Sequence, residues 1–204
     1  IASAEARIAF LGGSSHGVAR EKYDEALKIY RELGQDEQIA ETLFRLGEVC
    51  RGLGEASRAI ELLDEALSIF HKRQAKERVG YVLLELGGIL FGEGLFRDAE
   101  ARLKEALLVL KGLGDQRGTA AAFFHLGDVF EGAGELFEAR IYFHRAEDIF
   151  RRRGERRMLA EIHLKLGRVY EGLERLGEAS VFLEKAGSFF RDSGEPAKLA
   201  ETLL

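Results

Sequence analysis

The sequence of 204 residues contains one cysteine, one proline and no tryptophan. Cys50 therefore cannot form an internal disulfide, and the chain lacks the paired sulfur ligands of a zinc knuckle. A reducing, cytoplasmic compartment is the expected location. A single proline beside 24 glycines, in a chain rich in Leu, Ala, Glu and Arg, favours many helices separated by glycine-containing turns.

The chain also has no large excess of charge of one sign and no long apolar run. The 30 Lys and Arg nearly balance the 35 Asp and Glu, which excludes a nucleic-acid binder that relies on overall positive charge. The longest apolar stretches, such as residues 106–110, are far shorter than the ~20 residues of a membrane span. Because 46% of the residues are apolar, we expect a folded, soluble chain that is neither disordered nor inserted in a membrane.

The strongest signal that is present is an internal repeat with a period of 40 residues. Two alanine columns hold in all five units, and a Leu-Gly pair holds in four. The columns are Ala19, Ala59, Ala99, Ala139 and Ala179; Ala26, Ala66, Ala106, Ala146 and Ala186; and the pairs that start at Leu46, Leu86, Leu126 and Leu166. The chain is therefore predicted to be a single repeat array over 1–204, with units 1–34, 35–74, 75–114, 115–154 and 155–194 and a partial unit 195–204.

Each unit is predicted to fold as two helices of about 17 residues. In the second unit, one apolar stripe at helical spacing runs from Ile39 to Cys50, and after Gly52 another runs from Ala59 to Phe70. The alanines and the glycine of the Leu-Gly pair are expected to let the two backbones approach closely. A bulky side chain at these positions would then cost roughly 1 to 3 kcal/mol.

Glycines mark the expected helix ends, where a left-handed residue is favoured. They are Gly54, Gly94 and Gly134 after the first helix, and Gly34, Gly114, Gly154 and Gly194 after the second. Gln74 replaces glycine in one unit. Asp36 and Asp115 stand where an N-cap or first-turn acid stabilises a helix, and Pro196 stands where a helix begins.

The motif resembles the tetratricopeptide repeat over essentially the whole chain. It reads Leu-Gly, two residues, an apolar or aromatic residue, eight residues, Ala, three residues, Leu or Phe, two residues, Ala. The usual unit has 34 residues and a proline after its second helix, whereas positions such as His71 and Arg151 stand there in this sequence. The longer unit is similar to the 40-residue repeats of bacterial regulator and sensor arrays and of cell-polarity adaptors. This resemblance implies an all-α, right-handed superhelical solenoid of antiparallel helix hairpins.

The two ends are expected to lack the polar caps of a closed array. Residues 199–204 repeat the pattern of residues 39–44, which places them in the first helix of a sixth unit, and residues 1–11 occupy a first-helix position without the Leu-Gly pair. A larger parent array, a partner that covers the ends, or self-association through them is the expected explanation.

The resemblance also implies that the first helices line a concave groove that binds peptides, proteins or occasionally small signals. Tyr81 and Phe91 flank Gly88 on this face; they are either the centre of a binding site or contacts between units. With a mostly acidic rim, the bound segment is expected to be apolar with basic flanks. The candidate partner-binding residues are Arg45, Glu48, Tyr81, Glu85, Gly88, Phe91, His125, Asp128, Glu131, Lys165 and Arg168.

Several charged residues have simpler structural explanations. Glu41 with Arg45 and Glu161 with Lys165 have the i,i+4 spacing of ion pairs along one helix. The five arginines within residues 151–157 suit a helix C-terminus, with an acidic partner as the alternative. His125, Asp128 and Glu85 make a weak metal site conceivable, although a solvated or hydrogen-bonded histidine is favoured.

Two further features carry little chemistry. Residues 13–17 match the Gly-x-Ser-x-Gly nucleophile motif, but they fall in an expected turn between helices and not between a strand and a helix. Cys50 lies in an apolar column and is expected to be buried. No residue set indicates catalysis or a cofactor.

A binding module for a protein or peptide is therefore the predicted function. The alternative is a ligand-sensing region of a larger bacterial signalling or transcription-regulator protein.

Overall fold

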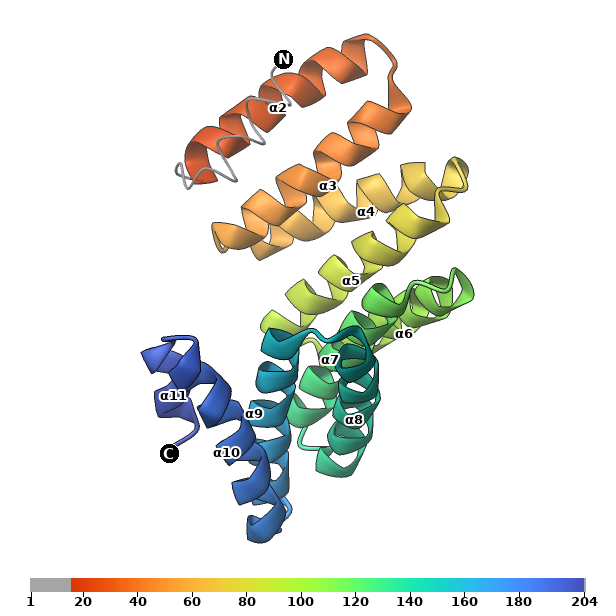
Figure 1. The fold of residues 1–204 in the computed structure, drawn as a ribbon. Helices are drawn as coiled ribbons and strands as arrows, with labels where there is room; N and C mark the ends of the chain where they lie inside the picture. Colours follow the sequence, from red (N-terminus) through yellow and green to blue (C-terminus); the bar gives the residue numbers. More distant parts are fainter. Residues whose placement is uncertain (1–15, 204) are drawn as a thin grey trace. The chain divides into compact units, whose positions relative to one another are not determined.

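The computed structural model describes residues 16–203 (Figure 1). In this part of the chain the structure is helical, without strands. The helices are α2 (His16–Glu32), α3 (Asp36–Gly52), α4 (Ala56–Lys72), α5 (Lys76–Gly92), α6 (Phe96–Gly112), α7 (Gln116–Gly132), α8 (Leu136–Arg153), α9 (Arg156–Gly172), α10 (Leu176–Asp192) and α11 (Pro196–Glu201). Most have the 17 residues expected from the repeat. The expectations for residues 1–11 and 13–15 and for Leu204 lie outside the described residues.

The chain divides into two compact units, Ile1–Val109 and Leu110–Leu204, with the division inside α6. In the first unit, α3 packs against α2 and α4, and α4 packs against α5. In the second unit, α8 packs against α7 and α9, and α10 packs against α9 and α11. Figure 1 shows that successive helices within each unit run antiparallel. The all-α hairpin architecture expected from the sequence is confirmed.

The small-residue columns form the contacts inside each hairpin. Every alanine of the two columns is buried. A Cβ atom built on Gly47 would lie 2.8 Å from Leu63 Cγ, and one built on Gly127 would lie 2.5 Å from Phe143 Cε1. Distances this short leave no room for a side chain, so the glycine of the Leu-Gly pair lets the two helices of a hairpin meet.

The turns have one conformation whether or not glycine is present. Gly54 has φ of +76°, and its N–H donates to the carbonyl of Arg51. Gln74 and Glu174 adopt the same left-handed region with φ of +56° and +60°. The substitution of glycine by Gln74 therefore leaves the turn unchanged, at the cost of the strain that a side chain has in this region.

The helix N-termini agree with the sequence signals. The Asp115 side chain caps α7 by accepting a 2.9 Å hydrogen bond from the Gly118 N–H. Asp36 lies in the first turn of α3, and Pro196 opens α11. No helix in the described part of the chain is both long and apolar enough to cross a bilayer.

Candidate functional site

The aromatic surface predicted around Gly88 lies on α5, in the first unit. Tyr81, Glu85, Gly88 and Phe91 follow one another at spacings of four and three residues and are all half-buried, as expected for one face of a helix. A Cβ atom built on Gly88 would meet no atom within 4 Å, so the space beside the helix backbone is open. Tyr81, Gly88 and Phe91 form a partly exposed apolar surface beside Glu85, with room for a ligand group.

A third ring extends this surface. Phe96, at the start of α6, is half-buried, and its ring centroid lies 6.0 Å from that of Phe91. Its equivalents in other units include Ala56 and Leu136, so a comparison of columns identifies Phe96 as unusual. The sequence interpretation missed it because it considered only first helices.

Arg45 lies between two carboxylates of its own helix. It contacts Glu41 at 3.2 Å and Glu48 at 2.9 Å, which confirms the i,i+4 pair expected from the sequence. Burial alone would lower the pKa of Arg45, but Glu48 and Glu41 outweigh it and raise the pKa. Burial also raises the pKa of Glu48 despite the neighbouring guanidinium. Both predicted site residues are thus held in contacts within the protein.

Other ion pairs on these helices join successive repeats. Arg51 of α3 contacts Glu85 of α5 at 3.3 Å, and Arg78 of α5 contacts Glu41 of α3 at 3.3 Å. Since these contacts link first helices that are 40 residues apart, they form a ladder along the face of the array in the first unit. Glu85 is therefore a paired carboxylate and not a free acidic rim residue.

The same arrangement recurs in the second unit. Lys165 of α9 contacts Asp128 at 2.8 Å and Glu131 at 3.1 Å, both on α7. His125 Nδ1 lies 3.6 Å from Asp128 Oδ2. Burial alone would lower the pKa of Lys165, but the two carboxylates outweigh it and raise the pKa. Asp128 and Glu131 therefore share one ammonium group, which offsets about half of their combined charge.

One expected pair takes different partners. Glu161 and Lys165 have the spacing of an i,i+4 pair, yet Lys165 reaches back to α7 and Glu161 contacts Lys198 of α11 at 3.1 Å. Arg168, another predicted site residue, contacts Glu201 of α11 at 2.8 Å. Pairing between repeats replaces pairing along the helix, because neighbouring first helices present opposite charges at close range.

A buried polar cluster between α8 and α9 was missed by the sequence interpretation. The Glu147 carboxylate is buried and lies 2.9 Å from His144 Nδ1 and 3.1 Å from His163 Nε2, and Arg151 also contacts it. Burial alone would raise the pKa of Glu147, but the hydrogen bonds from both histidines and the charge of Arg151 hold it far below its ordinary value. The Tyr170 hydroxyl lies 3.1 Å from His144 Nε2.

A sequence signal for this cluster exists. Glu147 stands in a column that holds Leu27, Leu67 and Leu107 in other units, and His163 stands in a column with Leu43 and Leu83. When two polar residues replace apolar ones on facing helices of neighbouring repeats, they are expected to satisfy each other by hydrogen bonding. We interpret the cluster as structural, because its groups are satisfied by one another.

The arginine-rich turn is largely neutralised by its surroundings. Arg151 contacts Glu147 and Asp148, Arg153 contacts Glu155 at 2.6 Å, and Arg157 contacts Glu195 at 3.0 Å. These contacts agree with the structural explanation of residues 151–157.

Cys50 is buried, as expected, and burial raises the pKa of its thiol to about 11. Of the Gly-x-Ser-x-Gly motif, only His16 and Gly17 are described, and both lie in α2. Within residues 16–203, no group of three or more His, Cys, Asp or Glu side chains could hold a metal ion.

Comparisons with known proteins support the repeat architecture. A family model described as tetratricopeptide repeat matches residues 11–72, 79–152 and 119–191. A search of curated protein sequences found no match.

Solved structures resemble this chain at low sequence identity. BtubC from P. vanneervenii is 21% identical with a TM-score of 0.81, over 93% of this chain and 78% of that one. A putative kinesin light chain with nearly identical TPR-like repeats from Podosopora anserina is 18% identical with a TM-score of 0.76, over 95% of each chain. The Rap conjugation gene regulator of plasmid pLS20, solved in complex with the Phr* peptide, is 18% identical with a TM-score of 0.74. The chain spans 54% of that regulator, which in turn covers 97% of this chain.

Proposed function

Because the chain belongs to the tetratricopeptide repeat family, we propose that it binds a peptide segment of a partner protein on the face formed by its first helices. The tetratricopeptide fold is generally a non-enzymatic scaffold for protein interactions. The plasmid regulator with the same fold was solved with a bound peptide, which supports this class of function. Catalysis is no part of the proposal.

The observation that carries the proposal is the apolar surface on the first unit. Tyr81, Phe91 and Phe96 are half-buried, and the backbone at Gly88 is open on the same helix face as Tyr81 and Phe91. Binding energy concentrates in a few large aromatic side chains, so a surface of this kind suits an apolar ligand side chain. The ion pairs between α3 and α5, Arg51 with Glu85 and Arg78 with Glu41, hold these two helices in a fixed orientation.

The chemistry of the ligand follows from which groups are already paired. Asp128 and Glu131 share the single charge of Lys165, and Glu85 is paired with Arg51. Much of the charge of these carboxylates is offset within the chain, so the proposal is limited to an apolar segment and does not include basic flanks. Arg45 pairs with Glu41 and Glu48 in the first unit, and Arg168 pairs with Glu201 in the second, so we assign both to contacts within their own unit.

The test uses peptides selected from a random library on the wild-type protein. Truncation of Tyr81 and Phe91 to Ala together is expected to weaken the selected peptides by tenfold or more. Gly88→Leu is a second variant, which fills the open space without removing any packing. The matched control is Leu108→Ala on α6, which removes a side chain that is 76% exposed outside this surface. Equal affinity of the wild type, the double variant and Gly88→Leu would contradict the proposal.

A further inference from the structure

Two columns of exposed positions on the second helices change from acidic to basic or apolar along the chain. They are Glu25, Glu65, Glu105, Arg145 and Lys185, and Glu21, Glu61, Ala101, Ile141 and Val181. The change falls in α8 and α10, which both belong to the second unit. The outer surface of these two helices therefore has a chemistry that the equivalent helices of the first unit lack.

The two cations in these columns lie over aromatic rings and not beside carboxylates. Arg145 Cζ lies 5.6 Å from the centroid of the Tyr142 ring, and Lys185 Nζ lies 5.0 Å from that of the Phe182 ring. In the described part of the chain, no carboxylate lies within ion-pair distance of either cation. Both positive charges thus remain available to a ligand, although the rings hold the side chains in place.

The rings beneath these cations are held in the same way in both repeats. Tyr142 stacks on Phe130 of α7 with a centroid distance of 5.1 Å, and Phe182 stacks on Tyr170 of α9 with a centroid distance of 5.4 Å. A cation whose position is fixed before binding loses less conformational entropy when a ligand binds it. The repeated stack therefore favours binding of an anionic group at each cation.

Exposed apolar side chains lie beside these cations. Phe137 is 63% exposed, Ile141 is 45% exposed and Val181 is 50% exposed. The rings of His144 and Phe182 contact each other at a centroid distance of 5.8 Å, so α8 and α10 lie against each other next to Ile141 and Val181. We call this surface the outer patch and define it as Phe137, Ile141, Arg145, Val181 and Lys185.

The carboxylates of α8 leave the outer patch with an excess of positive charge. Glu147 is buried, and Asp148 contacts Arg151 at 3.2 Å. Glu138 is the one carboxylate of α8 that has no ion pair in the described residues. Arg145 and Arg140 on the same helix outnumber it.

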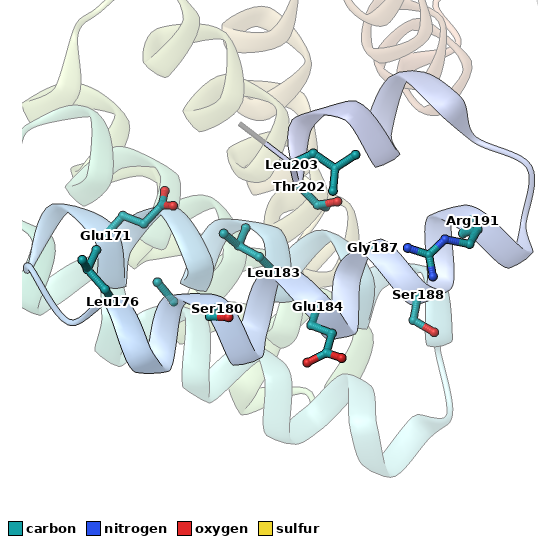
Figure 2. Close-up of a pocket in the computed structure, with 11 residues that line it drawn as sticks. Glu171, Leu176, Ser180, Leu183, Glu184, Gly187, Ser188, Arg191, Thr202 and Leu203 are labelled. Carbon is teal, nitrogen blue, oxygen red and sulfur yellow. The ribbon is translucent and has the colours of Figure 1, made fainter.

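The carboxylates of α10 do not cancel the charge of Lys185. Glu178 contacts Arg175, and Glu184 lines a cavity of about 660 Å³ over α10 (Figure 2). Neither Val181 nor Lys185 lines this cavity. Because successive residues of a helix are about 100° apart, the Glu184 carboxylate faces a different side of α10 from Lys185.

We propose that the outer patch binds an acidic segment of a partner protein that also carries apolar side chains. Carboxylates of the segment pair with Arg145 and Lys185, and its apolar side chains cover Ile141 and Val181. Charge complementarity selects this occupant, and the exposed apolar side chains favour a peptide over nucleic acid, since phosphate gains nothing from them. This surface is separate from the aromatic surface on α5.

A second copy of the chain is a less suitable occupant. The acidic columns of the first unit are already paired, since Glu65 contacts Arg31 at 2.6 Å and Glu61 contacts Arg58 at 2.9 Å. A second copy would have to break these pairs to bind the outer patch, whereas an acidic segment of another protein would not.

The proposal is tested by selecting peptides from a random library on the 204-residue protein with Tyr81 and Phe91 both changed to Ala. This background removes the rings of the aromatic surface on α5, so the result does not depend on whether that surface binds a peptide. The selected peptides are expected to be enriched in Asp and Glu together with apolar residues. Their affinity should fall as the salt concentration rises, because salt screens the exposed charges.

Variants that copy other repeats locate the binding surface. The double change Arg145→Glu and Lys185→Glu should weaken the selected peptides by roughly tenfold or more, and Ile141→Glu should also weaken them. Since glutamate occupies these columns in other repeats, the variants are expected to fold, which thermal unfolding checks. The matched control is Leu108→Glu, at an exposed leucine of α6, and it should leave the affinity unchanged.

Four results would overturn the proposal. The first two are selected peptides without acidic enrichment and the absence of any peptide that binds below about 1 mM. The third is affinity that the double change at Arg145 and Lys185 leaves intact in a folded protein. The fourth is that these two residues instead serve another occupant, shown either by duplex DNA that binds through them or by dimers in sedimentation velocity that the double change dissociates.

Discussion

Replacement of Gly127 by alanine tests the contact on which each hairpin depends. A Cβ atom at this position would lie 2.5, 2.6 and 2.9 Å from three atoms of the Phe143 ring. Phe143 is fully buried, and its ring packs against Phe124 at a centroid distance of 5.8 Å, so it has little freedom to move away. We expect an overpacking cost of about 1 to 3 kcal/mol.

The higher helix propensity of alanine opposes this cost. Alanine is more favourable than glycine in a helix interior by about 1 kcal/mol. Gly127→Ala should therefore lower the free energy of unfolding by up to about 2 kcal/mol, and Gly127→Val should lower it further, because valine adds two methyl groups to the same crowded space.

Two other glycines, in the same compact unit but in the next repeat, provide controls. At Gly167 the Cβ would meet Leu183 at 2.5 Å, but Leu183 is half-buried beside the cavity over α10 and can shift. Gly167→Ala should therefore cost less than Gly127→Ala. At Gly177 the Cβ would meet nothing within 4 Å, so Gly177→Ala should be neutral or stabilising.

Urea unfolding followed by circular dichroism measures these differences. The expected order of stability is Gly177→Ala, then Gly167→Ala, then Gly127→Ala, then Gly127→Val. If Gly127→Ala were as stable as Gly177→Ala, the close packing of Gly127 on Phe143 would be refuted as the reason for the Leu-Gly column.

Three further predictions concern stability. Glu147→Gln should lower the free energy of unfolding by about 1 to 3 kcal/mol at neutral pH, since it removes the charge of a buried hydrogen-bond acceptor. Because the folded-state pKa of Glu147 is depressed, this contribution is present above its unfolded value near 4.5 and is lost as the pH falls below it. Chemical unfolding of both proteins from pH 7 to pH 3 should therefore show the difference in stability shrinking. Gln74→Gly and Glu174→Gly should each stabilise the protein by roughly 1 kcal/mol in thermal unfolding, because both residues have positive φ; an unchanged midpoint would argue that the turns are unstrained. Asp115→Ala should cost about 1 kcal/mol through loss of the cap on Gly118, and Asp115→Asn, which keeps the cap, should recover most of it in the same assay.

The repeated part of the structure could be predicted from the sequence, and the unrepeated part could not. The two helices of each hairpin pack in the same way, so residues such as Ala59, Gly47 and Gly54 recur at a fixed spacing. These columns alone predict the helices, the turns and the close contacts. Glu147 and His163 occur in one unit, and their meaning depends on a contact between helices that no period shows.

The candidate site lies between these two cases. The position of Tyr81 and Phe91 on one helix face followed from the spacing, but the partners of the charged residues did not. Lys165 has Glu161 four residues before it in the sequence, and Asp128 and Glu131 of α7 lie near it in space. Only the distances show that Lys165 pairs with the carboxylates of α7. Side-chain reach across repeats, rather than sequence separation, decides these contacts.

The fixed register between repeats also restricts how the gene of such a protein can change in length. One residue added inside a helix rotates everything after it by about 100°, which turns buried columns toward water. Gain or loss of a whole 40-residue unit leaves every such column in place, since Gly47, Gly127 and Gly167 meet equivalent residues of their own hairpins. We therefore expect the fold to accept the gain or loss of whole 40-residue repeats, and insertion of a single residue within a helix to destabilise it.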